Sequence, residues 1–381
     1  MVKIRYPEIP SPCYVLVEDL LRANLKILRH VSEQSGAKIL LALKGYALWR
    51  SFPLVAEYLH GITASGIYEA RLGAEEFKGG EICVYSPAFK ESEIDALLPI
   101  ADHIIFNSPT QLQRFKRKVL GAERKIDCGI RLNPLYSEVS PPIYNPCIEG
   151  SRLGIVPEEL HKCELEGVSG LHFHTHCEQN SDALQRTLEH FELHFGHLID
   201  RMKWVNFGGG HHITRKDYDV NLLIEIIKDF RARHGGIDVY LEPGEAVGWQ
   251  CGFLKGTVLD ITYNTMPIAI LDVSASAHMP DCLEMPYRPM IRGSAEPGML
   301  PYTYRFGAPT CLAGDVIGDY SFESAIEIGD EVIFEDMIHY TIVKNNTFNG
   351  IPLPSIGMLR SDGSFKLLRE FGYEHYKERN S

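Results

Sequence analysis

Lys44 is the residue whose chemistry most needs an explanation, because it ends the apolar run from Lys38 to Lys44. A lysine that is buried away from water loses its proton readily, and the resulting amine is a nucleophile that can form a Schiff base with an aldehyde. The alternative is a lysine that caps the strand and extends its flexible stem to water. Lys44 is therefore a candidate anchor for an aldehyde, provided that the rest of the chain supplies matching groups.

Three consecutive glycines, Gly208, Gly209 and Gly210, end another apolar run. Glycine lets the backbone approach an anion closely, and N–H groups beside a helix terminus can bind phosphate oxygens. The same motif is common in flexible turns, so taken alone it leaves a phosphate site and a simple turn both open.

Glu242 lies where the segment Leu-Glu-Pro-Gly-Glu turns the chain out of an apolar run. A carboxylate in this position could hold a pyridine nitrogen protonated, which makes a pyridoxal ring a strong electron sink. A helix-capping or salt-bridged glutamate would have the same sequence, so this alternative also stays open.

His172, His174 and His176 alternate along one segment, and in a strand they would project to one side. One imidazole could lie flat against a cofactor ring. Alternatively, a His-x-His pair on a barrel strand can chelate zinc and activate water for hydrolysis. The remaining ligands of such a zinc site would be His211, His212 or Glu242. Because zinc would leave the lysine and the glycines unexplained, we predict no metal site.

The elements that must position these residues repeat a strand–helix unit, since short apolar runs alternate with segments of helical period. We expect strands at 38–44, 61–66, 81–86, 103–107, 126–133, 167–177, 202–208 and 237–242. We expect helices at 48–60, 67–79, 91–100, 110–120, 179–200 and 218–234. Eight such units predict a (β/α)8 TIM barrel over residues 20–248, an α/β fold whose functional residues lie at the carboxyl ends of the strands.

The residue pattern changes after Gly248. From there on, Pro and Gly separate short strand-like runs, and no segment of helical period lies between them. These runs lie at 256–263, 269–273, 331–334 and 339–344. They predict a C-terminal all-β domain, a sandwich or barrel, over residues 249–381. The N-terminal segment 1–19, with a strand-like run at 13–17, is expected to join this domain.

Composition narrows the class of protein. The chain has 381 residues, 45% of them hydrophobic, which is enough for two domains. The absence of a long apolar stretch, and of a secretory signal between Met1 and Pro12, predicts a cytoplasmic protein without a membrane partner. A net charge of −12 disfavours nucleic acid and suits a cationic small molecule. Nine scattered cysteines without a CxxC pair argue against a disulfide framework.

Together these motifs resemble the fold-type III pyridoxal-phosphate enzymes, the family that contains alanine racemase and the decarboxylases of ornithine, arginine and diaminopimelate. The resemblance covers nearly the whole chain and implies pyridoxal 5'-phosphate as cofactor. It also implies that Lys44 binds the cofactor aldehyde, that His174 stacks on the pyridine ring and that Glu242 pairs with the ring nitrogen. Gly208 to Gly210 and Tyr340 match the residues that bind the phosphate.

The resemblance further implies a homodimer with shared active sites, because Cys311 and Asp315 match a loop that the second subunit lends to the site. Racemases of this family have arginine where Glu242 stands, so the resemblance implies a decarboxylase. The family usually has arginine after Glu-Pro-Gly, whereas this chain has Glu245. Exchange of a cation for an anion suits a substrate tail that carries amines.

Segments 278–289, 309–320 and 346–350 resemble one branch of the family, which decarboxylates carboxynorspermidine and carboxyspermidine to norspermidine and spermidine in polyamine biosynthesis. This resemblance implies a small cationic carboxylated polyamine as substrate, whose amines Glu245, Asp281 and Asp315 are candidates to bind. Cys311 is the expected proton donor to the α-carbon, and Lys44 is its rival. The alternatives are a decarboxylase of diaminopimelate or another basic amino acid, and a non-catalytic homologue that acts as a binding protein.

Overall fold

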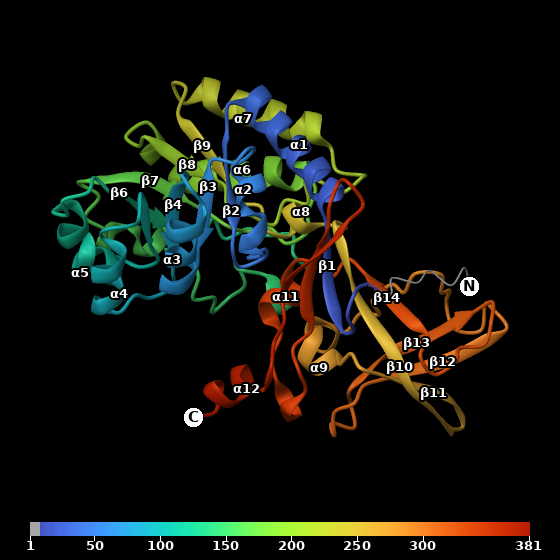
Figure 1. Cartoon of the computed structure of the whole chain (residues 1–381). Coiled ribbons are helices and arrows are strands. Elements are labelled where there is room, and N and C mark those ends of the chain that lie inside the picture. The colour runs from blue at the N-terminus through green and yellow to red at the C-terminus, as the bar shows by residue number, and fades with distance from the viewer. Residues whose placement is uncertain (1–7) are drawn as a thin grey trace. The chain divides into compact units, whose positions relative to one another are not determined.

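The computed structural model describes residues 8–381, which divide into two compact units. One unit spans Asn24–Val247, and the other combines the chain up to Ala23 with Gly248–Ser381 (Figure 1). Residues 1–7, part of the predicted segment 1–19 and of the stretch searched for a secretory signal, lie outside the described residues. Between residues 8 and 381, none of the helices combines the length and the apolar character needed to cross a membrane.

The first unit is a closed barrel of parallel strands, which confirms the predicted TIM barrel. Its strands, in barrel order, are β2 (Lys38–Ala42), β3 (Gly61–Ala64), β4 (Glu81–Tyr85), β5 (His103–Phe106), β6 (Asp127–Arg131), β7 (Val168–His172), β8 (Trp204–Asn206) and β9 (Asp238–Leu241). The barrel closes where β9 pairs with β2, with Leu241 opposite Ile39. Buried apolar runs form these strands because each is covered on both faces, inside by the other strands and outside by helices.

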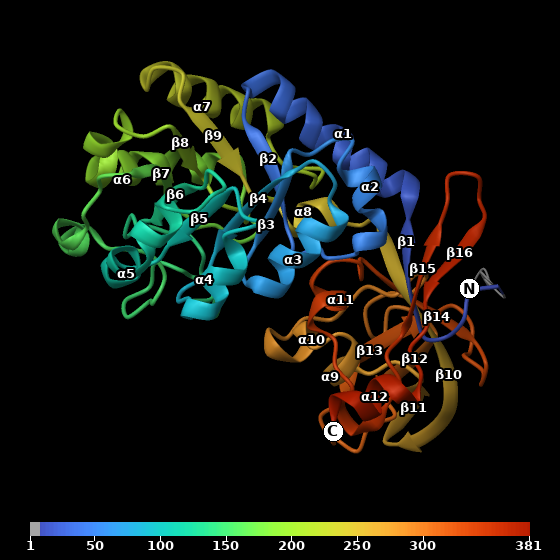
Figure 2. The same ribbon diagram turned by 60° about the vertical axis from the view of Figure 1, so that its left-hand side comes forward.

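Helices lie outside the ring of strands (Figures 1 and 2). They are α1 (Glu18–Ser35), α2 (Phe52–Val55), α3 (Ile67–Glu76), α4 (Glu91–Leu97), α5 (Pro109–Leu120), α6 (Ser181–Ile199) and α7 (Val220–Arg233), with 3-10 turns at Trp49–Ser51, Pro142–Tyr144 and Pro157–Lys162. The helix expected at 48–60 is wrong, since only a 3-10 turn and the short α2 form there. Pro53 has no N–H to continue a helix from the preceding turn, so α2 begins anew.

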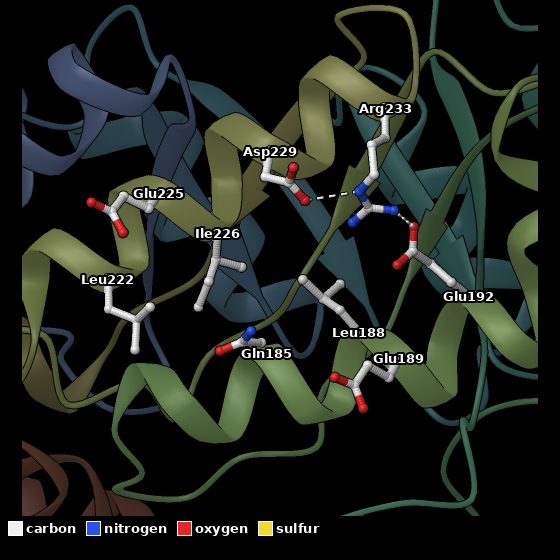
Figure 3. Close-up of a pocket in the computed structure, with 9 residues that line it drawn as sticks. All are labelled: Gln185, Leu188, Glu189, Glu192, Leu222, Glu225, Ile226, Asp229 and Arg233. Atoms are coloured by element: carbon white, nitrogen blue, oxygen red, sulfur yellow. Dashed lines mark hydrogen bonds and ion pairs between the residues drawn. The ribbon is translucent and has the colours of Figure 1, made fainter.

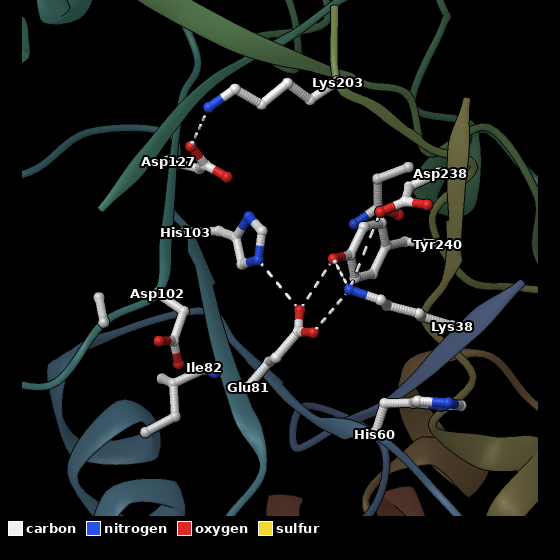
Figure 4. A network of polar contacts seen from close by, with 12 residues as sticks. Lys38, His60, Glu81, Ile82, Asp102, His103, Asp127, Lys203, Asp238 and Tyr240 are labelled. Carbon is white, nitrogen blue, oxygen red and sulfur yellow. Dashed lines mark hydrogen bonds and ion pairs between the residues drawn. The ribbon is translucent and has the colours of Figure 1, made fainter. Parts of the chain in front are cut away.

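The amino end of the barrel is closed by a polar network around Glu81 (Figure 4). Its carboxylate accepts hydrogen bonds from Lys38 Nζ at 2.8 Å and Tyr240 Oη at 2.9 Å, and His103 Nε2 lies 3.1 Å away. Burial alone would raise the pKa of Glu81, but the hydrogen bonds from His103, Lys38 and Tyr240 lower it to about 2. Above this network Trp204 and Leu40 belong to the barrel core. Because the side chains of this network pair with one another, we expect the reactive groups at the carboxyl ends of the strands.

The second unit is built on a mixed sheet of eight strands within the described residues. The strands are β1 (Cys13–Val17), β10 (Gly252–Asn264), β11 (Met266–Leu271), β12 (Tyr302–Gly307), β13 (Val316–Phe322), β14 (Glu331–Glu335), β15 (Ser355–Leu359) and β16 (Phe365–Arg369). Their order is β13-β12-β11-β10-β1-β15-β16, and β14 pairs with β10. The N-terminal strand β1 thus lies between β10 and β15.

α8 (Glu245–Gly248) lies where the chain passes from the first unit to the second. The short helices of the second unit are α9 (Ala275–His278), α10 (Asp281–Glu284), α11 (Tyr340–Lys344) and α12 (Tyr373–Arg379), with a 3-10 turn at Phe348–Gly350. The strand expected at 339–344 is wrong, because α11 occupies it. Asp336 adopts a left-handed backbone, with φ of 61°, and turns the chain away after β14. The β-branched residues that follow therefore form a helical turn, since the tertiary context overrides their strand propensity.

Candidate active site

The predicted chemical groups follow four strands that are consecutive neighbours in the barrel, in the order β7, β8, β9 and β2. His174 follows β7, the glycines follow β8, Glu242 follows β9 and Lys44 follows β2. Because the carboxyl ends of parallel strands meet at one rim, this order brings segments from distant parts of the sequence together.

Lys44 lies in a turn rather than in a strand, because β2 ends at Ala42. The turn packs on the chain that follows β9, where a Cβ on Gly45 would come within 2.8 Å of the backbone nitrogen of Glu245. Lys44 is exposed at the rim, yet the protein around its ammonium removes enough water to lower its pKa, and the charge of Arg131 adds to the effect. A lowered pKa favours the neutral amine that the proposed chemistry needs.

Glu242 is a buried carboxylate whose two oxygens both have partners. Asn206 Nδ2 donates to Oε1 at 2.7 Å, and His172 Nε2 lies 3.4 Å from Oε2. Burial opposes ionisation, but contacts with His172, Asn206 and Thr63 outweigh it and bring the pKa of Glu242 below its usual value. The group is therefore an ionised acceptor suited to a protonated ring nitrogen.

His174 is a half-buried, neutral imidazole with a fixed orientation. Its Nδ1 accepts the N–H of Gly209 at 3.0 Å, so the proton of the neutral ring lies on Nε2. Burial, followed by the charges of Lys44 and Arg131, holds the pKa of His174 well below its usual range. A neutral, oriented ring is what stacking on a cofactor requires.

The three histidines of this segment do not share one face, which corrects the expected alternation. β7 ends at His172, so the period of two stops before His176. His176 is buried elsewhere, with Nδ1 3.0 Å from Gln179 Oε1 and its ring 4.7 Å from that of His211. Side-chain ligand atoms of His172, His174 and Glu242 lie within 4.8 Å of one another, a spacing that a metal could also use. Within the described residues that group does not extend to His211 or His212, the further ligands weighed for zinc.

The triple glycine forms a tight turn in which side chains cannot fit. Gly208 and Gly210 have φ of 71° and 81°, and a Cβ on Gly210 would lie 2.0 Å from the carbonyl oxygen of His176. The N–H of Gly208 already donates to Asn206 Oδ1 at 2.8 Å, and that of Gly209 donates to His174. Among described residues, no hydrogen bond is formed by the N–H of Gly210. Of the three glycine N–H groups, that of Gly210 is therefore left for an anion. Helix α7 begins only at Val220, so a helix terminus does not adjoin the glycines as expected.

The other predicted residues belong to the second unit. Tyr340 begins α11, and Asp281 at the start of α10 is paired with Lys344. Cys311 is exposed, and its N–H donates to Asn349 Oδ1 at 2.6 Å. Asp315 is buried and accepts from Ser274 Oγ at 2.7 Å and from the N–H of Ser276 at 3.0 Å. The carboxylate of Asp315 thus orders the turn before α9.

Sequence reasoning missed Arg131, which ends β6. The guanidinium lies 4.7 Å from the centre of the Tyr85 ring and donates to the carbonyl oxygen of His174 at 3.0 Å. Arg131 also lowers the pKa of both Lys44 and His174. Its position at the carboxyl end of a barrel strand was a usable signal, because the same rule located Lys44 and Glu242.

A pocket of about 420 Å³ lies between α6 and α7 (Figure 3). Leu188, Leu222 and Ile226 contribute its apolar surface. Arg233 pairs with Glu192 and, at 2.8 Å, with Asp229. Because none of the predicted site residues lines this pocket, we place the chemistry at the barrel rim instead.

Comparison with known proteins agrees with this geometry. A family model described as pyridoxal-dependent decarboxylase, C-terminal sheet domain, matches residues 17–338. The chain therefore belongs to the pyridoxal-dependent decarboxylase family.

Individual relatives within this family are similar to the chain over nearly its whole length. The chain is 47% identical to a carboxynorspermidine/carboxyspermidine decarboxylase of Campylobacter jejuni, over 98% of this chain and 100% of that protein. It is 45% identical to a carboxyaminopropylagmatine decarboxylase of Synechocystis, over 98% of this chain and 96% of that protein. The crystal structure of carboxynorspermidine decarboxylase with norspermidine from Campylobacter jejuni superimposes with a TM-score of 0.91 at 45% identity, covering 98% of this chain and 100% of that one. Diaminopimelate decarboxylase of Helicobacter pylori, at 17% identity and a TM-score of 0.84 over 97% of each chain, shares the fold.

Proposed function

We propose that this chain decarboxylates carboxynorspermidine and carboxyspermidine to norspermidine and spermidine, with pyridoxal 5'-phosphate as cofactor. The observation that carries the proposal is the 47% identity, over the full length, to a decarboxylase named for these two substrates. The rim of the barrel supports it, because a lysine, an oriented histidine, a glycine turn and a buried carboxylate meet at neighbouring strand ends.

The residues of the rim fit this cofactor. Lys44, with its lowered pKa, would bind the aldehyde, and the free N–H of Gly210 would donate to the phosphate. Tyr340 is the proposed second phosphate contact. Glu242 would hold a proton on the ring nitrogen, and His174 would lie against the ring. When bound, pyridoxal phosphate supplies an aldehyde that condenses with amines and a ring that accepts the electrons released as carbon dioxide leaves.

The protein's own groups then have distinct tasks. Lys44 would hold the aldehyde of the cofactor and, once its amine is free, would act as a base beside the substrate. Arg131 contributes to keeping this amine neutral. After carbon dioxide leaves, a proton must reach the α-carbon. Cys311, lent by the second subunit of the proposed homodimer, is the first candidate for this transfer, and Lys44 is its rival.

Carboxylates are proposed to bind the amines of the substrate. Glu245 is the first candidate, because its backbone adjoins the turn that carries Lys44. Asp281 is already paired with Lys344, so a substrate ammonium would have to replace that lysine. Asp315 accepts several protein hydrogen bonds, which supports an ordering role beside any contact with substrate. A cytoplasmic location stays a prediction.

A second candidate substrate is carboxyaminopropylagmatine, because the relative named for it is 45% identical over nearly the whole chain. Its name indicates an agmatine part, whose guanidinium replaces a primary amine. A carboxylate such as Glu245 can pair with either cation, but a planar guanidinium offers two parallel N–H groups to it. The likeness to diaminopimelate decarboxylase is limited to the fold.

Turnover measurements test the proposal. Purified protein loaded with cofactor would be given carboxynorspermidine, carboxyspermidine, carboxyaminopropylagmatine, diaminopimelate and ornithine, and the release of carbon dioxide would be recorded. We expect the first two to have the highest kcat/KM and Lys44→Ala to abolish turnover. Lys26→Ala, on the exposed surface of α1, is the matched control and should retain full activity. Preference for carboxyaminopropylagmatine would favour the second candidate, and no turnover of any amine would refute both.

A further inference from the structure

His172 is a buried imidazole without an aligned hydrogen bond. The last residue of β7, it is 1% exposed, and neither Nδ1 nor Nε2 has a hydrogen-bond partner in the part of the chain that the structure describes. The loss of water around a buried polar group costs free energy unless a partner replaces it. An unsatisfied buried imidazole beside a functional carboxylate therefore needs an explanation.

The surroundings of His172 point to Glu242. Its Nε2 lies 3.4 Å from Glu242 Oε2, slightly longer than a formed hydrogen bond, and its ring lies 5.5 Å from that of Tyr85. Burial lowers the pKa of His172, so the ring is neutral and carries a single N–H. The adjacent carboxylate favours the tautomer with the proton on Nε2, because that N–H can then point at Oε2.

The opposite oxygen of Glu242 is bound independently. Asn206 donates to Oε1 at 2.7 Å and simultaneously accepts the N–H of Gly208. The two donors, from β7 and β8, thus approach the carboxylate that follows β9 from neighbouring strands. Other titratable or charged groups acting on Glu242, His172 or both are Lys44, Cys83, Tyr85, Arg131 and His174.

We propose that His172 is a positioning residue that donates a hydrogen bond to Glu242 and, with Asn206, keeps it a carboxylate toward the cofactor ring. This inference rests on the proposed function and deepens it. With the cofactor bound, one proton would be shared between Glu242 and the ring nitrogen. A carboxylate that already accepts two hydrogen bonds is a weaker base, so the proton stays on the nitrogen. Without His172 the carboxylate becomes a stronger base and draws that proton toward itself.

The test follows the proton directly. Apoprotein would be loaded with pyridoxal phosphate labelled with ¹⁵N in the ring, and the ¹⁵N chemical shift would be measured for the wild type and two variants. His172→Phe keeps a ring but removes both nitrogens, whereas His172→Gln places an amide N–H near the position of Nε2. We expect the wild type and His172→Gln to give a protonated nitrogen. We expect His172→Phe to shift toward the neutral form and to lose about tenfold in kcat at unchanged KM, the effect of one pKa unit.

The amino end of the barrel offers a matched control. His103 is also a buried histidine beside a carboxylate, 3.1 Å from Glu81, but it belongs to the opposite end of the strands. His103→Phe should lower stability and leave the ¹⁵N shift unchanged. If His172→Phe does not fold, His172→Asn takes its place, because the shorter amide cannot reach Oε2 and should give the same shift.

Three results would overturn the inference. The first is a folded His172→Phe protein with the wild-type ¹⁵N shift and kcat. The second is a folded His172→Gln protein that behaves like the Phe variant, since the packing of the ring would then be what matters. The third is an equal shift in His103→Phe. Failure of the proposed function itself would appear differently, as wild-type protein that binds no cofactor or releases no carbon dioxide.

Discussion

Replacement of Glu81 by glutamine tests the account of the closed amino end of the barrel. The change removes the charge that pairs with Lys38 and His103 but keeps the shape of the side chain. The pKa of Glu81 falls from 4.5 to about 2, which corresponds to about 3 kcal/mol at 1.36 kcal/mol per unit. Because 30% of the side chain is exposed, solvent screening reduces this to about 2 kcal/mol.

Thermal unfolding at pH 7 is the direct assay. For a unit of this size, about 2 kcal/mol lowers Tm by roughly 4–8 °C. Decarboxylation at 25 °C should be unchanged, because Glu81 lies at the end of the barrel opposite to Lys44. Glu91→Gln is the matched control, since Glu91 pairs with Lys118 on the surface and should leave Tm unchanged.

The stability that Glu81 contributes should also depend on pH in a definite direction. A carboxyl group whose pKa is lower in the folded state than in the unfolded chain contributes stability above the unfolded value of 4.5, and the contribution disappears as the pH falls through about 2. The stability difference between wild type and Glu81→Gln should therefore be constant from pH 7 to about 5 and shrink below it. Equal Tm values at pH 7, or a difference that grows on acidification, would refute the reasoning.

Three further predictions concern the rim of the barrel. Gly210→Ala should weaken cofactor binding about tenfold or more in an absorbance titration, because φ is 81° and the new Cβ would meet a carbonyl oxygen at 2.0 Å. Gly150→Ala is the control, since Gly150 has a similar φ of 77° but lies in open space, and it should leave cofactor binding unchanged. Glu245→Gln should raise KM for carboxyspermidine about tenfold without changing cofactor affinity, and an unchanged KM would remove Glu245 from the substrate site. Arg131→Met should move the pH profile of cofactor uptake by the apoprotein to higher pH, because loss of the nearby cation raises the pKa of Lys44; an unmoved profile would contradict that coupling.

The barrel could be predicted from the sequence because each of its strands is a short buried run followed by a helix or turn. Local errors have local physical causes. Pro53 restarts the helix expected at 48–60, and the left-handed turn at Asp336 converts the expected strand at 339–344 into α11. The expected elements were predicted from the pattern of apolar and polar side chains. In both places a single backbone constraint outweighed that pattern.

In the candidate site, the reactive groups could be predicted from the sequence, whereas the contacts that support them could not. Lys44 and Glu242 could be found because a reactive group directly after an apolar run lies at the rim of any parallel barrel. The supporting contacts could not, since they depend on which strands are neighbours and in what register. Pairing of Asn206 with Tyr240 sets β8 against β9 so that the Asn206 amide reaches Glu242.

The three alternating histidines show most clearly what the sequence could not predict. They are the same residue type at every second position, yet each has a different role. The strand ends at His172, whose ring stays beside Glu242. The chain then leaves the sheet, with the carbonyl of His174 bound to Arg131 and its ring bound to Gly209. His176 consequently packs on His211 instead of on the rim. The alternation of histidines is thus real in the sequence, but the register of β6, β7 and β8 decides which of them reaches the chemistry.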